Sequence, residues 1–208
     1  MRTRPEPLPR SFRIVAALAA AGALGVLALA LLLVGRDEPP LRLYPLPDFA
    51  LVDDGGRAFG PERLAGKVSV VNFIFTSCPT VCPALTARMA WLQGRLDEPA
   101  VQLVSISVDP KNDTPEVLRE YGERFGRDPA RWTFVTGELG AVKRAVEEGF
   151  RVVMGGAASG ASALDIVHGE HFVLVDGERT IRGYYRPDEE SLARLERDAR
   201  RLAREEAR

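Results

Sequence analysis

The chain has few of the side chains that build metal sites or disulfide frameworks. Its 208 residues include only two cysteines and two histidines. Two cysteines exclude a framework of several disulfides. The formal net charge of -1 and the absence of a P-loop or Gly-rich dinucleotide fingerprint give no reason to expect a nucleic-acid or nucleotide partner. There is also no proline between Pro129 and Pro187.

One long apolar run is present near the N-terminus. Residues 14–35 carry no charge, and about 20 such residues cross a bilayer as a helix. Because the arm 1–13 before the run is basic, the positive-inside rule places it in the cytoplasm. A cleaved signal peptide is the alternative, but it usually has a shorter apolar region and an A-x-A-like end. We expect an uncleaved single-pass anchor in the inner membrane, with the following domain on the periplasmic side.

The rest of the chain alternates between strand and helix patterns. Residues 36–47 contain four prolines and predict a semi-extended linker, and residues 48–208 predict one domain. The domain begins with a hairpin, continues as alternating strands and helices, and closes with a second hairpin and a charged helix. This order predicts an α/β, thioredoxin-like fold, with a central mixed sheet flanked by helices and an N-terminal β-hairpin extension. The strands are expected at 48–52, 57–59, 67–76, 101–108, 132–135, 171–175 and 180–185. Four helices are expected: one after Pro83, one from 113 to about 125, one at 139–150 and one that begins at 188.

Both cysteines lie in one stretch, Cys78-Pro79-Thr80-Val81-Cys82-Pro83, between a buried strand and a helix. Such a pair forms a redox disulfide, binds a soft metal, or supplies a catalytic thiol and its resolving partner. Pro79 disfavours helix at Cys78, and Pro83 suits a first helical turn. We therefore expect Cys82 at the helix start, where free N–H groups and the dipole lower a thiol pKa.

The two histidines, His168 and His171, lie together before the second hairpin. In a thioredoxin-like topology the loop before this hairpin passes close to the cysteine loop. Two thiolates and one imidazole suit copper or zinc, and structural zinc normally has four protein ligands. The set Cys78, Cys82 and His168 therefore favours copper, as Cu(I), Cu(II) or both, and His171 is the weaker candidate.

With these residues, the chain resembles the Sco/SenC family of membrane-anchored copper proteins over roughly residues 46–185. The resemblance rests on residues 72–83, on Ser107-Val108-Asp109-Pro110 with Asp113-Thr114-Pro115-Glu116, and on His168. It implies a thioredoxin-like fold and copper bound by Cys78, Cys82 and His168. The implied partners are cytochrome c oxidase subunit II or a similar copper acceptor, and a thiol reductant or another copper chaperone. The family often has Asp where this chain has Thr80 and Val167, which bears on affinity and partner.

Three functions remain open. In the first, the protein is a metallochaperone without turnover, and the Gly-, Ala- and Ser-rich residues 155–163 let His168 swing away for copper release. In the second, Cys78 and Cys82 are the redox pair of a thiol–disulfide reductase that keeps the partner's copper-ligand cysteines reduced. In the third, the protein is a peroxiredoxin-type peroxidase. That family has Thr three residues and Pro seven residues before its reactive Cys, where this chain has Phe75 and Val71, so the sequence favours this function least.

Overall fold

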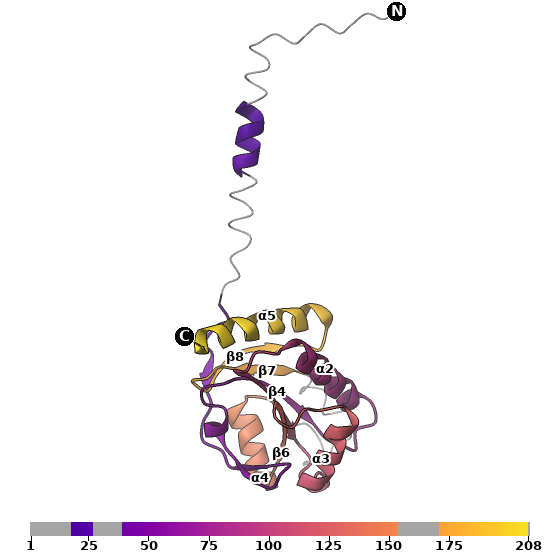
Figure 1. Cartoon of the computed structure of the whole chain (residues 1–208). Coiled ribbons are helices and arrows are strands. Elements are labelled where there is room, and N and C mark those ends of the chain that lie inside the picture. Colours follow the sequence, from indigo (N-terminus) through magenta and orange to yellow (C-terminus); the bar gives the residue numbers. More distant parts are fainter. Residues whose placement is uncertain (1–17, 27–38, 154–170, 208) are drawn as a thin grey trace, which may run out of the picture. The chain divides into compact units, whose positions relative to one another are not determined.

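The computed structural model describes residues 18–26, 39–153 and 171–207 (Figure 1). The chain divides into two compact units, Met1–Pro39 and Pro40–Arg208. In the first unit residues 18–26 are helical, and residues 14–17 and 27–35 of the predicted anchor lie outside the described residues. Within the described ranges, no helix is long and apolar enough to cross a membrane.

One mixed sheet forms the centre of the second unit (Figure 1). Its eight strands have the order β1-β8-β7-β4-β5-β6-β2-β3. The three central strands β4, β5 and β6 are parallel, while β7 pairs antiparallel with β4 and β2 pairs antiparallel with β6. The strands are β1 Tyr44–Pro45, β2 Leu51–Asp53, β3 Ala58–Phe59, β4 Val68–Ile74, β5 Val101–Ser107, β6 Trp132–Thr136, β7 Phe172–Val175 and β8 Thr180–Tyr185. This sheet confirms the predicted α/β class.

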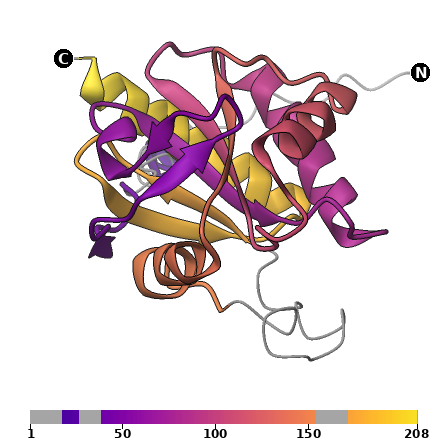
Figure 2. The ribbon, with the colours of Figure 1, turned by 90° about the horizontal axis from the view of Figure 1, so that it is seen from below.

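Helices cover both faces of the sheet. Two hydrophobic clusters result, one under α2, α3 and α5 and the other under α4 and η2. Figure 2 shows α4 and η2 on one side of the sheet and α5 on the other. The helical elements are η1 Pro61–Arg63, α2 Val81–Arg95, α3 Pro115–Arg124, α4 Leu139–Lys143, η2 Arg144–Gly149 and α5 Glu189–Glu206.

The central strand β4 is buried at every position. Alternate side chains point to opposite faces of a strand, so Val70 and Ile74 join the cluster under α2, whereas Val71 and Phe73 join the cluster under α4. Coverage on both faces is why this strand is almost wholly apolar.

The helix predicted over residues 139–150 changes its winding midway. It is α-helical to Lys143 and continues as a π-helix, η2, to Gly149. Phe150 follows as its C-terminal cap, and its ring packs edge-on against Phe73 with 5.5 Å between the ring centroids. The position of the helix was predicted correctly. The change from α-helical to π-helical winding was not predicted.

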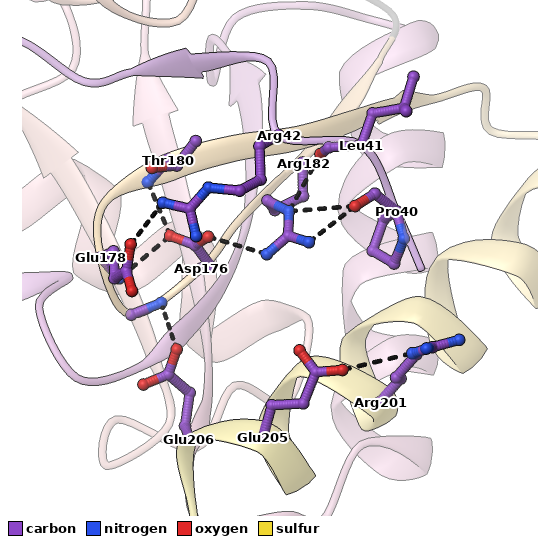
Figure 3. Close-up of polar contacts among 11 residues, drawn as sticks. Pro40, Leu41, Arg42, Asp176, Glu178, Thr180, Arg182, Arg201, Glu205 and Glu206 are labelled. Atoms are coloured by element: carbon purple, nitrogen blue, oxygen red, sulfur yellow. Dashed lines mark hydrogen bonds and ion pairs between the residues drawn. The ribbon is translucent and has the colours of Figure 1, made fainter. Parts of the chain in front are cut away.

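The segment predicted as linker also differs from expectation. Tyr44 and Pro45 form the edge strand β1, and a clamp of hydrogen bonds holds the residues before it (Figure 3). Arg182, whose side chain is 9% exposed, donates to the Pro40 carbonyl at 2.7 Å and the Leu41 carbonyl at 3.0 Å, and it pairs with Asp176 at 2.9 Å. The folded unit therefore begins at Pro40 rather than after residue 47.

The clamped segment joins the sheet at the end where β4 begins. β1 pairs with Ile181 and Thr180 of β8, and Ile181 is opposite Val175, which is opposite Ser69 near the start of β4. The other end of β4, at Ile74, leads directly into the cysteine loop. From Ser69 to Ile74 a strand extends about 16 Å, so the chain joins the domain well away from the cysteines.

Candidate metal centre

The strand β4 leads into α2 (Figure 1), and the two cysteines lie in the chain between the end of β4 and the first turn of α2. After β4 the chain turns, with the Cys78 N–H donating to the Phe75 carbonyl at 3.3 Å. Thr80 is the N-cap residue of α2, Cys82 is the second helical residue, and Pro83 lies in the first turn as predicted. Both cysteines are free thiols.

The Cys78 sulfur accepts hydrogen bonds from the start of α2. The N–H of Cys82 donates to it at 3.3 Å, a group that has no partner within the helix itself. Partial burial acts to raise the pKa of Cys78, but hydrogen bonds from the backbone N–H groups of Cys82, Thr80 and Val81 outweigh it. The pKa of Cys78 is consequently below its ordinary value.

Cys82 behaves in the opposite way. Its side chain is in the core, 4% exposed, and its sulfur accepts from the Phe75 N–H at 3.5 Å. Burial raises the pKa of Cys82 to about 12, and the neighbouring Cys78 and Asp113 act in the same direction. The prediction that the helix start lowers the pKa of Cys82 is therefore wrong. The free N–H groups of α2 point to the sulfur of Cys78, and Cys82 faces the apolar interior.

A buried carboxylate, Asp113, fixes the cysteine loop. It accepts hydrogen bonds from the Thr76 N–H at 3.1 Å, from the Thr76 hydroxyl at 2.5 Å and from the Ser107 hydroxyl at 2.5 Å. The predicted helix from 113 begins at Pro115, and Thr114 caps it by accepting from the Val117 N–H at 3.4 Å. Asp113 instead ties the loop after β4 to the end of β5.

Thr86 and Tyr121 form a second polar contact, next to Cys82. Thr86 donates to the carbonyl of Cys82 at 2.8 Å, and its hydroxyl is 3.0 Å from the hydroxyl of Tyr121. Burial raises the pKa of Tyr121, which therefore stays a neutral phenol. Sequence reasoning missed Asp113 and Tyr121 as neighbours of the thiols. The signals available were a carboxylate six residues after Ser107 and a tyrosine within the apolar face of a helix.

The described residues supply two of the three predicted ligands. His168 lies outside the described residues, as do Val167 and residues 155–163. His171 is described and immediately precedes β7. Across the described ranges, no three His, Cys, Asp or Glu side chains come together as a metal-binding group. The cysteine pair itself fits a soft metal, because both sulfurs belong to one loop and helix start and soft cations prefer thiolate.

Comparisons with known proteins agree on one family. The sequence model of a family described as SCO1/SenC matches residues 42–204. A SCO1/SenC family lipoprotein from Bacillus anthracis str. Ames is 34% identical, with a TM-score of 0.70, over 81% of this chain and 98% of that chain.

Two further solved structures are similar. BsSco, described as a member of the Sco family of cytochrome c oxidase assembly proteins with a disulfide switch, is 26% identical with a TM-score of 0.69, over 80% of this chain and 97% of its own. Yeast Sco1 with copper bound is 26% identical with a TM-score of 0.62, over 76% of this chain and 90% of its own. These likenesses confirm the α/β, thioredoxin-like fold. This chain spans half or less of the length of the curated relatives that it matches first.

Proposed function

The chain belongs to the SCO1/SenC family, and from this membership we propose that it binds copper and delivers it to cytochrome c oxidase subunit II or a similar acceptor. Sco proteins take part in copper handling and in cytochrome c oxidase assembly, as the copper-bound structure of yeast Sco1 and the description of BsSco indicate. Copper is the cargo in this proposal, bound on arrival and released to the acceptor.

The unequal environments of the two thiols are the observation that carries the proposal. Cys78 is partly exposed and supported as a thiolate by the start of α2, while Cys82 is buried beside it. An incoming metal therefore meets Cys78 first, and Cys82 completes the pair from the protein side. Both thiols lose their protons when they ligate copper, so uptake releases protons to solvent.

His168 is the proposed third ligand. The support is its position a few residues before β7, the antiparallel neighbour of β4, from which the cysteine loop departs. Imidazole suits both Cu(I) and Cu(II), and two thiolates with one imidazole satisfy a copper ion that tolerates low coordination.

We further propose that residues 14–35 anchor the protein in the inner membrane and that its domain lies in the periplasm. The support is the uncharged run itself, the basic arm before it, and the lipoprotein nature of the related Bacillus anthracis protein. Pro40 and Leu41, the first residues of the domain, are held by hydrogen bonds from Arg182.

Copper titration of residues 40–208, which form one compact unit, tests the proposed site. The reduced, anaerobic protein should bind one copper ion per chain tightly. Changing both cysteines to Ser should abolish binding, and His168→Ala should weaken it about tenfold or more. The matched control is His171→Ala, which removes the other imidazole and should bind like wild type. Binding that is indifferent to His168 contradicts the three-ligand site.

The same thiol asymmetry supports a second candidate, a thiol–disulfide reductase. The partly exposed Cys78 thiolate attacks a partner disulfide, forms a mixed disulfide and releases one partner thiolate. Cys82 then loses its proton and attacks the sulfur of Cys78, which releases the second partner thiolate and leaves a Cys78–Cys82 disulfide. An external thiol reductant must restore the pair. With Cys82→Ser the reaction should stop at the mixed disulfide, and a His168→Ala protein that still functions in cells would favour this role over delivery.

A further inference from the structure

A polar cleft lies between the end of the β7–β8 hairpin and the start of α5. Its volume is about 530 Å³. The residues that line it and matter here are His171, Arg186, Asp188, Glu190, Arg194 and Arg197. We call it the arginine cleft.

Three arginines line the arginine cleft, against the two carboxylates of Asp188 and Glu190. Asp188 is engaged as the cap of α5, where it accepts from the Ser191 N–H at 2.8 Å and from the Ser191 hydroxyl at 3.0 Å. Arg186 and Arg197 are exposed and form no ion pair or hydrogen bond with any described residue. Both side chains are exposed, so an anionic partner can reach their guanidinium groups, although Arg186 also helps to lower the pKa of the neighbouring Asp188.

The charges are spread along the cleft rather than gathered at one point. Arg194 and Arg197 are three residues apart on α5 and therefore share a face. From the first residue of α5 to Arg197 the helix rises about 12 Å, with Arg186 before it on the connection from β8. A single phosphate contacts only part of this length. An extended peptide covers it with about four residues, and its carboxylates meet guanidinium groups that bind them in bidentate fashion.

The arginine cleft lies at the same end of the sheet as the thiols. Val173 of β7 pairs with Val71 of β4, so His171 is level with Phe73, next to the end of β4. Tyr185 pairs with Phe172, which brings Arg186 to this end as well. The cysteine loop departs from the same end of β4. A partner bound in the cleft is thereby held at the end of the domain from which copper is to be transferred.

We propose that the arginine cleft docks an acidic peptide segment of the partner that accepts copper. This rests on the proposed delivery function for the identity of the partner, but the chemistry of the cleft stands by itself. Docking here, away from the thiols, leaves Cys78 and Cys82 free to pass on the metal while charge complementarity speeds encounter.

The test uses a fluorescein-labelled peptide of eight glutamates and residues 40–208, measured by fluorescence polarisation at low salt. The variant Arg186→Glu with Arg197→Glu reverses the two exposed charges. The matched control, Lys67→Glu with Arg144→Glu, changes the net charge equally at exposed residues outside the cleft. The milder pair Arg186→Gln with Arg197→Gln guards against misfolding, and urea unfolding checks all three.

We expect the peptide to bind wild type, to lose at least about tenfold in affinity with the reversed pair, and to change by about twofold or less with the control. The Gln pair should fall between. No binding to wild type, equal losses in cleft and control variants, displacement of the peptide by millimolar phosphate, or preferential binding of phosphatidylglycerol vesicles would each overturn the proposal.

Copper titration of the same proteins separates the two proposals. All variants should bind copper like wild type, because none removes a proposed ligand. Copper binding without peptide binding overturns the docking site alone. If the peptide binds in a way that depends on the arginine charges but the protein does not bind copper, the proposed copper delivery is overturned and the docking site for an acidic segment stays supported.

Discussion

Asp113→Asn is the substitution that most directly tests how the cysteine loop is held. Asp113 is fully buried and accepts from three donor groups, the Thr76 N–H, the Thr76 hydroxyl and the Ser107 hydroxyl. Asn has nearly the same shape but one acceptor oxygen, and its amide NH₂ turns a donor toward the remaining donors. The variant therefore loses the charge and leaves at least one buried donor unpaired.

The magnitude follows from those contacts. A hydrogen bond to a charged group contributes about 1.5–3 kcal/mol, and a buried group left unpaired costs about 1–3 kcal/mol. Because three donors share one carboxylate, the losses do not simply add. We expect Asp113→Asn to lower the free energy of unfolding by about 2–3 kcal/mol, and Asp113→Ala by about 3–5 kcal/mol.

Urea unfolding of residues 40–208 measures the change, with Asp97→Asn as the control. Asp97 is exposed, so this variant should stay within about 0.5 kcal/mol of wild type. A double-mutant cycle with Thr76→Val should give a coupling energy above about 1 kcal/mol between Thr76 and Asp113. An Asp113→Asn protein that unfolds at the urea concentration of wild type would refute the carboxylate's role in holding the loop.

Two other predictions concern the thiols and the clamp. In the metal-free, reduced domain at neutral pH, iodoacetamide should alkylate Cys78 well before Cys82, because Cys78 has a lowered pKa while Cys82 is buried with a pKa of about 12. Peptide mass spectrometry across a pH series checks this: the rate at Cys78 should level off at a lower pH than that of a free cysteine, and equal rates at both thiols would contradict it. Arg182→Ala should lower the free energy of unfolding by about 3 kcal/mol, since it strands the buried Asp176 and frees Pro40. Limited proteolysis should then cleave residues 39–46, and an uncut segment with unchanged stability would contradict the clamp.

The sequence predicts those parts of the fold that depend on local pattern. The apolar run over β4 and the positions of Pro79 and Pro83 predict a buried strand, a loop and a helix start, and all three are present. The strand β1 was missed because Tyr44 and Pro45 lie among prolines, and their pairing with β8 depends on residues far along the chain. A local pattern does not encode that pairing.

The candidate site shows the same limit in its electrostatics. Spacing alone places both cysteines near a helix start, but it does not say which sulfur faces the free N–H groups. That depends on how α2 sits on the sheet, which turns Cys82 into the core and leaves Cys78 at the helix end. The role of Asp113 was not predicted for a similar reason. Its partner Thr76 lies in the loop after β4, far from Asp113 in the sequence, and an Asp just before a helix also fits a helix cap.

The clamp lies at one end of the sheet, and the thiols and the arginine cleft lie at the other. The clamp at Pro40 lies at the end of the sheet where β4 begins, while the cysteine loop and the arginine cleft lie at the end where β4 finishes. The cysteine loop and the two exposed arginines are therefore about 16 Å further along the sheet than the clamp. A copper acceptor with an acidic segment therefore reaches the cysteine loop and the arginine cleft from the same end of the sheet.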